Sequence, residues 1–184
     1  MEGIKNKKIE TILDAWKYVL SWKILGGGYL RCFLVFTDDV LIEFETNLQT
    51  KTLPFKGGSY SNDLLSNIFW GTINTLLYEV FGYSDKLNKI YQNKSLEIND
   101  LENILRNNKV KYKLNPIVTY EKINQIKIKE LGKVSFTRDD IEIVLEIFYN
   151  NKKLKYEAYI SDRTLYINIK EKLMKLLENK VIIN

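Results

Sequence analysis

The sequence predicts an α+β fold in which a bent antiparallel sheet, or a partly open barrel, is capped by a C-terminal helix. Two observations carry this prediction. Paired apolar runs are joined by turn residues over positions 33–44, and apolar and polar residues alternate in later runs between residues 117 and 160. A period of two is typical of strands that bury one face. With 184 residues and 45% apolar content, the chain can bury a core as a single domain.

The N-terminal region predicts an amphipathic helix over about residues 8–22. Lys and Asp residues fall between apolar side chains that recur at helical spacing. The apolar positions are Ile9, Ile12, Leu13, Trp16, Val19 and Leu20. A glycine run at 26–28 ends this segment, and residues 29–45 are rich in β-branched and aromatic types. Asp38 and Asp39 are the predicted turn of a hairpin, because Asp tolerates left-handed conformations and bonds its own backbone.

A helical insertion is predicted over about residues 57–113. A polar residue at 62–63 can cap a helix from Leu64 to about Phe81, and a shorter helix follows over residues 99–107. The longer helix has an apolar stripe broader than packing on one sheet face requires. Three interpretations are open: core of the insertion, an interface with a protein partner or a second copy, and insertion into a membrane surface. Its polar face has no Lys or Arg, which disfavours the membrane interpretation.

The last third predicts strands followed by a helix. Alternation is clearest over residues 141–147 and 154–160. Turns are predicted at Gly132–Lys133, at residues 137–140 and at residues 150–152. In the last hairpin Glu146 can face Lys155 across the strands. After Asp162 the spacing of Ile169, Leu173, Leu176 and Leu177 predicts a closing helix that packs on the sheet.

The net charge of +5 comes entirely from the second half of the chain. The charges there mostly alternate in sign, as on a solvent-exposed strand or helix face. A basic strip with tyrosine stacking faces would instead suit nucleic acid. Its residues would be Lys127, Lys129, Lys133, Lys153 and Lys155, with Tyr149, Tyr156 and Tyr159 nearby. Glutamates on the same strands would repel phosphate, so nucleic-acid binding is the alternative and not the leading hypothesis.

The residue types give little support for catalysis. The chain has no histidine, the commonest general base and metal ligand. Cys32 lies in an apolar run without an activating neighbour in sequence, so it is predicted to be a buried apolar residue. The pairs Asp38–Asp39 and Asp139–Asp140 lie at predicted turns, where Asp is common for backbone reasons. We therefore expect no enzyme activity, no metal site and no cofactor.

The expected compartment is the cytoplasm. A single cysteine cannot form an internal disulfide, which indicates a reducing environment. The N-terminus has mixed charges and Lys17 and Lys23 interrupt the early apolar stretch, so no signal peptide is predicted. No window reaches the roughly 20 apolar residues of a membrane span.

Two segments resemble a known family. Gly28-Tyr29-Leu30 followed by residues 33–42 is similar to the opening strands of pleckstrin-homology-like domains, including their GRAM-related members. Residues 116–126 are similar to the next strand in many bacterial and archaeal members. The resemblance covers about two-thirds of the chain at the level of fold, and implies a bent sheet or partly open barrel plugged by the last helix. Residues 57–113 depart from the family, which has a short connection there.

The resemblance implies a binding function. Members bind inositol lipids or proteins, and the lipid-binding ones place several Lys/Arg between their first two strands. Here that loop, near residues 25–28, has no cation beyond Lys23, so specific phosphoinositide binding is not expected. The leading hypothesis is a non-enzymatic binding or assembly module that acts through a protein partner or self-association, as a homo-oligomer. The predicted contact residues are Ile68, Phe69, Trp70, Ile73 and Leu77. The alternatives are nucleic-acid binding and peripheral membrane contact.

Overall fold

The computed structural model describes residues 2–21, 26–46, 95–107, 109–135, 138–160 and 163–184. The chain divides into two compact units, Met1–Lys51 with Ser95–Asn184, and Thr52–Lys94. The second unit lies outside the described residues. The predicted helix from Leu64, with its five predicted contact residues, lies there too, and stays a prediction. The account below concerns the first unit.

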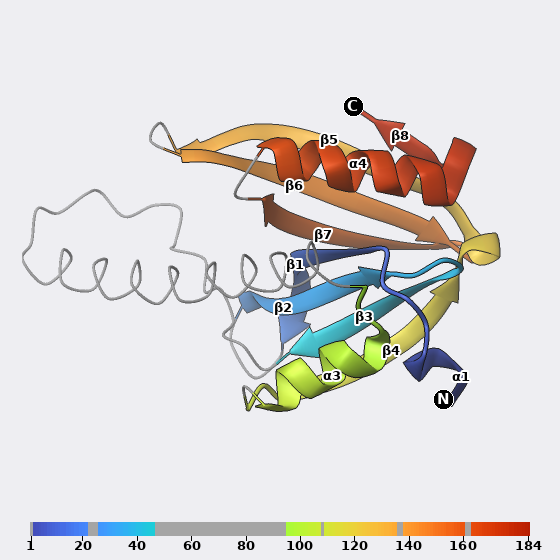
Figure 1. Cartoon of the computed structure of the whole chain (residues 1–184). Helices are drawn as coiled ribbons and strands as arrows, with labels where there is room; N and C mark the ends of the chain where they lie inside the picture. Colours follow the sequence, from blue (N-terminus) through green and yellow to red (C-terminus); the bar gives the residue numbers. More distant parts are fainter. Residues whose placement is uncertain (1, 22–25, 47–94, 108, 136–137, 161–162) are drawn as a thin grey trace, which may run out of the picture. The chain divides into compact units, whose positions relative to one another are not determined.

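This unit is an α+β fold, as predicted, with eight strands in the described part (Figure 1). In chain order the elements are α1 (Glu2–Lys5), β1 (Thr11–Ser21), β2 (Gly26–Phe36), β3 (Val40–Thr46), α3 (Ile98–Asn107), β4 (Tyr112–Thr119), η1 (Tyr120–Lys122), β5 (Ile123–Ser135), β6 (Arg138–Tyr149), β7 (Lys152–Ile160), α4 (Arg163–Leu177), η2 (Glu178–Lys180) and β8 (Val181–Ile183). The predicted helix over 99–107 is confirmed as α3 and the closing helix as α4.

All eight strands belong to one sheet in the order β4-β3-β2-β1-β7-β6-β5-β8. Every neighbouring pair is antiparallel except β5 and β8, which are parallel. The short parallel strand after α4 was not predicted. The sheet is thus two antiparallel groups, β1–β4 and β5–β7, joined where β1 pairs with β7.

Two predicted hairpins are confirmed. Thr37 donates its backbone N–H to the carbonyl of Val40 (3.0 Å), which closes the turn between β2 and β3 at Asp38–Asp39. Asn150 and Asn151 have φ of 43° and 59° and form the turn between β6 and β7. Asn is one of the few residues that tolerates this left-handed conformation. The register places Glu146 opposite Lys155, as predicted.

The predicted helix over residues 8–22 is wrong, because residues 11–21 form strand β1. Ile12 and Trp16 lie on one face of the sheet and Leu13 on the other, and all three are buried. A strand buried on both faces has apolar residues at even and odd positions, and here the combination imitates a helical spacing. The intervening polar residues are not on a solvent face, since Asp14 is paired with Arg31 and Lys17 with Glu43.

Two predicted turns in the last third are also corrected. Gly132–Lys133 is not a turn, because β5 continues to Ser135. The register between β5 and β6 shifts between Glu130 and Gly132, which is typical of a β-bulge: an extra residue in a continuing strand. Asp139 and Asp140 lie inside β6, so they are strand residues and not turn residues.

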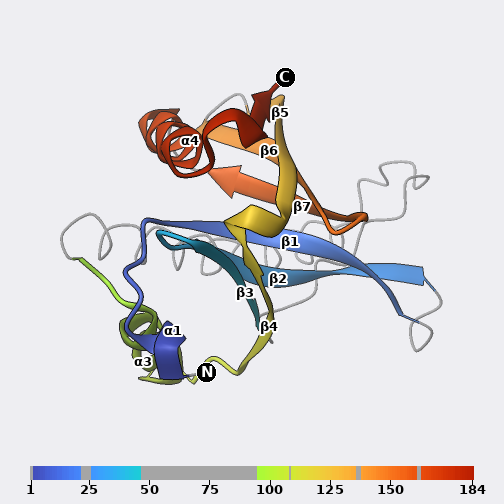
Figure 2. The same cartoon turned by 90° about the vertical axis from the view of Figure 1, so that its right-hand side faces the viewer.

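The core lies on the face of the sheet that packs against α4, called here the inner face. Both strand groups contribute: Leu13, Leu34 and Leu41 from β1–β3, and Ile126, Ile128, Leu145 and Ile147 from β5–β6. The core residues of α4 are Tyr166, Ile169, Leu173 and Leu177. Figure 2 shows this helix beside β6 and β7. Because side chains of both strand groups pack in one cluster, the sheet bends around this core. The opposite side of the sheet is called the outer face.

Candidate functional site

The outer face of β5, β6 and β7 carries a row of alternating charges. The strand registers place Lys127 opposite Glu146, and Glu146 opposite Lys155. Glu146 is paired with Lys153 at 2.6 Å, and this ammonium group lowers the pKa of the Glu146 carboxyl by hydrogen bonding. Cross-strand pairs of opposite charge stabilise a sheet by a few tenths of a kcal/mol each. The row is therefore electrically mixed.

Phe148 contributes an aromatic ring to this face. Its ring lies 5.3 Å from the Lys127 ammonium nitrogen and 5.4 Å from that of Lys153. An ammonium group near a ring is attracted by the negative charge of the ring face. The half-buried ring and the two cations therefore form one compact cluster.

The structure brings together part of the predicted basic strip. Lys127, Lys153 and Lys155 share the outer face with Lys129, which is exposed. The side chain of Lys133 is outside the described set, as is that of Tyr159. The predicted stacking tyrosines are wrong where they can be judged: Tyr156 is buried in the core and Tyr149 packs against it.

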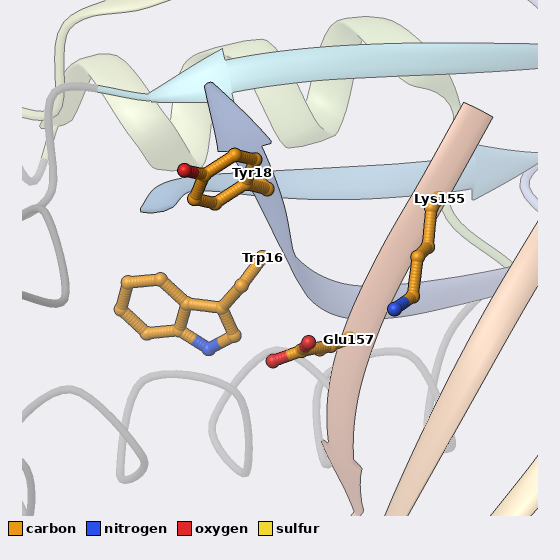
Figure 3. Close-up of a pocket in the computed structure, with 4 residues that line it drawn as sticks. All are labelled: Trp16, Tyr18, Lys155 and Glu157. Atoms are coloured by element: carbon orange, nitrogen blue, oxygen red, sulfur yellow. The ribbon is translucent and has the colours of Figure 1, made fainter. Parts of the chain in front are cut away.

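A pocket of about 290 Å³ lies beside this charged row, lined by Trp16, Tyr18, Lys155 and Glu157. Trp16 and Tyr18 are two residues apart on β1, and Lys155 and Glu157 are two apart on β7, so each pair projects from one face of its strand. Figure 3 shows β1 bending away from β7 beside these four side chains. Among the described residues, the lining thus includes two aromatic rings, an ammonium group and a carboxylate.

The pocket lies where two strands part. β1 pairs with β7 over three residues, Ala15–Lys17 opposite Tyr156–Ala158. Continuing this register would set Tyr18–Ser21 opposite Lys152–Lys155, yet among the described residues no such pairs form. On its other side β7 pairs with β6 along the whole of Lys152–Ile160. Among the described strands, the segment Lys152–Lys155 therefore has no partner on the side of β1, and this side is called here the β7 edge.

A buried ion pair lies behind Trp16 on the outer face. Arg31 donates to both carboxylate oxygens of Asp14, including a bond from Nε at 2.9 Å. The guanidinium carbon lies 5.9 Å from the Trp16 ring and 5.6 Å from the Phe33 ring. Burial raises the pKa of Asp14, and the charge of Arg31 opposes that rise. The ion pair therefore lies next to Trp16, one of the aromatic residues that line the pocket.

A second polar cluster lies on the inner face around Glu43, which is 6% exposed. The carboxylate accepts hydrogen bonds from Lys17 (3.1 Å), Asn115 (2.5 Å) and the Tyr156 hydroxyl. Burial, followed by the Glu43 charge, raises the pKa of Tyr156, so the phenol stays protonated. Because the carboxylate has several donors and Lys17 balances its charge, we interpret the cluster as structural.

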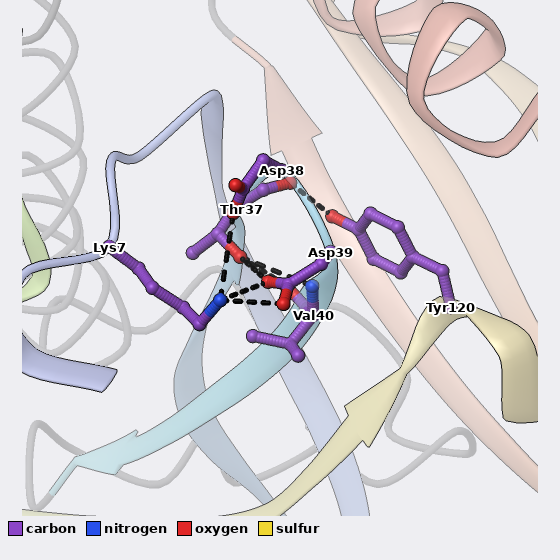
Figure 4. A network of polar contacts seen from close by, with 6 residues as sticks. All are labelled: Lys7, Thr37, Asp38, Asp39, Val40 and Tyr120. Carbon is purple, nitrogen blue, oxygen red and sulfur yellow. Dashed lines mark hydrogen bonds and ion pairs between the residues drawn. The ribbon is translucent and has the colours of Figure 1, made fainter. Parts of the chain in front are cut away.

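The turn at Asp38–Asp39 is held by a network of hydrogen bonds and ion pairs (Figure 4). Lys7 donates to Asp39 at 2.6 Å, and the Tyr120 hydroxyl donates to the carbonyl of Thr37 at 2.6 Å. The Tyr120 backbone N–H donates to the carbonyl of Asp39 (3.0 Å). The network ties the N-terminus and the β4–β5 connection to the β2–β3 turn. Asp38 and Asp39 therefore have a structural role.

Cys32 is buried, as predicted, and its thiol lies 3.5 Å from the carbonyl oxygen of Ala15. Burial raises the pKa of this thiol well above its usual value, which disfavours the nucleophilic thiolate. Among the described residues no group of three or more Cys, Asp or Glu side chains is placed to hold a metal ion.

The sequence does not predict that Trp16 and Tyr18 line a pocket together, because the apolar spacing of residues 8–22 predicts a helix. The available signal was the pair of aromatic residues at positions 16 and 18, which share a face only in a strand. No family model matches the chain, and no curated protein matches it either. None of the described helices has the length and apolar character needed to cross a membrane.

Proposed function

We propose that this protein is a non-enzymatic binding module of pleckstrin-homology-like type that acts by protein–protein contact. The fold assignment is supported by the strand order. Four strands and three further strands form consecutive antiparallel meanders, and α4 follows β7 and packs on the core. This agrees with what the resemblance implies for a bent sheet plugged by its last helix. The short strand β8 is an addition to that pattern.

The observation that carries the functional proposal is the mixed character of the outer face of β5–β7 and its pocket. Lys127, Glu146 and Lys155 alternate in one cross-strand row beside an aromatic ring. A polyanion such as nucleic acid would be attracted by the lysines of this row and repelled by its glutamates. A protein surface can offer both signs of charge together with an apolar group for the pocket. Protein is therefore the preferred class of partner.

Self-association through the helix predicted from Leu64 to about Phe81 is part of the same proposal. The argument for it is the width of its apolar stripe in the sequence. A contact of this kind buries large apolar side chains such as Phe69 and Trp70. We therefore expect a homo-oligomer in solution.

The first experiment is the solution mass of the purified chain, measured by light scattering after size exclusion across a concentration series. We expect an oligomer that persists at low micromolar concentration. Trp70→Asp should then produce a folded monomer if the helix is the contact, whereas Phe148→Glu should do so if the outer face is. Phe148→Glu suits the fold, because the new carboxylate would lie between Lys127 and Lys153. Ile167→Glu, at an exposed position on α4, is the control.

A second arm measures binding of a fluorescein-labelled single-stranded oligonucleotide at low and at moderate salt. Polyanion binding through several lysines falls steeply as salt is added. A strict monomer that binds the oligonucleotide with such a salt dependence would overturn the proposal in favour of nucleic acid. An oligomer with no such binding would support it.

A further inference from the structure

The structure points to one binding mode at this site: we propose that the split between β1 and β7 receives an extended acidic segment of a partner protein, which pairs with the edge of β7 at Lys152–Lys155. This deepens the proposed function, on which it rests, by naming the chemistry and conformation of the bound segment.

The first argument is the edge itself. β7 is fully paired with β6, but its pairing with β1 stops at Tyr156. Alternate residues of a strand direct their N–H and C=O groups to the same side, so a four-residue edge offers roughly two donors and two acceptors. Such an edge is a template for a further strand. Any extended segment that enters the split can use these groups.

The second argument is charge. The edge carries Lys152, Lys153 and Lys155, and all three side chains are exposed. Lys153 is held by Glu146, whereas Lys152 and Lys155 form no ion pair within the described part of the chain. Lys153 and Lys155 project from the outer face and Lys152 from the opposite face, because side chains alternate along a strand. Within the described part, the charge of Glu146 is shared by Lys153 and Lys155, so the short edge keeps a positive charge. This favours a segment with Asp or Glu at alternate positions facing Lys153 and Lys155. A basic segment would be repelled.

The third argument is the pocket, which provides a place for one larger side chain. Trp16 and Tyr18 line it from β1, and Lys155 and Glu157 from β7 (Figure 3). A segment paired with the edge at Lys155 would project an alternate side chain over these rings, because strand side chains alternate between faces. Glu157 lies two residues after Lys155 on β7, and its carboxylate would repel an acidic side chain of the bound segment at the pocket. The segment is thus acidic along the edge and apolar or aromatic at the pocket.

The test is a selection from a random ten-residue peptide library displayed on phage, with the full chain as bait. The test variant is the double variant Lys152→Glu with Lys155→Glu. The control, Lys122→Glu with Lys175→Glu, changes the net charge equally at exposed lysines outside the split and outside the outer face of β5–β7. We expect enriched peptides with acidic residues at alternate positions, bound about tenfold more weakly by the test variant and within about threefold by the control.

A second measurement isolates the backbone pairing. An enriched peptide is resynthesised with N-methyl groups at alternate residues, which removes backbone donors while keeping the side chains. Strand pairing predicts loss of binding by one of the two methylation patterns, and slower amide exchange at residues 152–155 with the unmodified peptide. Equal binding of both methylated copies would overturn strand pairing.

The remaining outcomes separate this inference from the broader proposal. Acid-poor peptides, or peptides that bind the test variant as well as the wild type, would overturn the acidic segment at this edge. In that case, an oligomer in the solution-mass experiment would still support the proposal of protein–protein contact. Failure to enrich any peptide would likewise overturn the inference, whereas a salt-sensitive oligonucleotide complex would overturn both.

Discussion

At the scale of single residues, Asp14 and Glu43 are buried carboxylates of the described part, and both are held by hydrogen-bond partners. The buried carboxylate of Glu43 lies on the inner face between Lys17, Asn115 and Tyr156. Removing one member of such a group leaves the others buried without partners, which costs more than the bond itself contributes. The same residue types in the outer-face row are more exposed. That contrast is why we place binding on the outer face and structure on the inner one.

The ion pair between Lys7 and Asp39 gives a prediction for pH dependence. The hydrogen bond from Lys7 lowers the pKa of Asp39 below 3.8, its ordinary value. Because the lowered pKa belongs to the folded state, the pair contributes stability above pH 3.8, and this contribution is lost as the pH falls through the lowered pKa. Both side chains are partly exposed, so solvent screening limits the contribution to about 0.5 kcal/mol.

We therefore expect Lys7→Met to lower the free energy of unfolding by about 0.5 kcal/mol at pH 6, and the difference from wild type to be smaller at pH 3. Urea unfolding followed by circular dichroism at both pH values measures this difference. Lys5→Met, at an exposed position on α1, is the matched control. A difference that grew toward acid pH would contradict the assignment.

At the scale of elements, the hairpins are determined by their turns. Asn150 and Asn151 both have positive φ, the conformation required at the two central residues of a type I′ turn. The twist of that turn matches the twist of the flanking strands. It sets the register that places Glu146 opposite Lys155 and orders the β7 edge. The turn therefore positions the candidate site, although it lies outside it.

Asn150→Ala should lower the free energy of unfolding by about 1 kcal/mol, because Ala tolerates the left-handed conformation poorly. Asn168→Ala, the same substitution at an exposed position of α4, should leave stability unchanged or raise it slightly. Thermal unfolding of the two variants beside wild type measures both effects. Equal melting temperatures for the two variants would show that the turn does not constrain the hairpin.

At the scale of the whole described unit, α4 holds the two strand groups on one core. Its buried residues pack in a cluster to which both β1–β3 and β5–β7 contribute. Lys172 of α4 donates to the carbonyl of Glu10, just before β1 (2.9 Å), and Lys180 of η2 donates to that of Tyr120, between β4 and β5 (2.7 Å). The angle between β1 and β7, and with it the pocket, depends on this packing.

Leu173→Ala should lower the free energy of unfolding by about 2–5 kcal/mol, because it leaves a cavity at the centre of that cluster. Met174→Ala, one position along and exposed, should change it by less than about 0.5 kcal/mol. Urea titration of the two variants gives the comparison. Similar losses for both would show that α4 does not close the core as described.

Sequence alone determined those parts whose signals are local. The turns at Asp38–Asp39 and Asn150–Asn151 depend on the backbone preferences of Asp and Asn, and the closing helix on an apolar stripe of its own. The lysines of the outer face were also predicted, since alternation places them together wherever the strands pair. Each of these features is encoded within a few neighbouring residues.

Tertiary structure alone decided the features that depend on which strands become neighbours. The apolar spacing of β1 resembles that of a helix, because this strand is buried on both faces. Glu43 has no feature in the sequence that separates it from a solvent-exposed glutamate, since its partners Lys17 and Tyr156 belong to other strands. The pocket needs Trp16 and Glu157, which are distant in the chain and opposite each other in the sheet. Long-range pairing is set by the sum of many weak contacts, so no local pattern contains it.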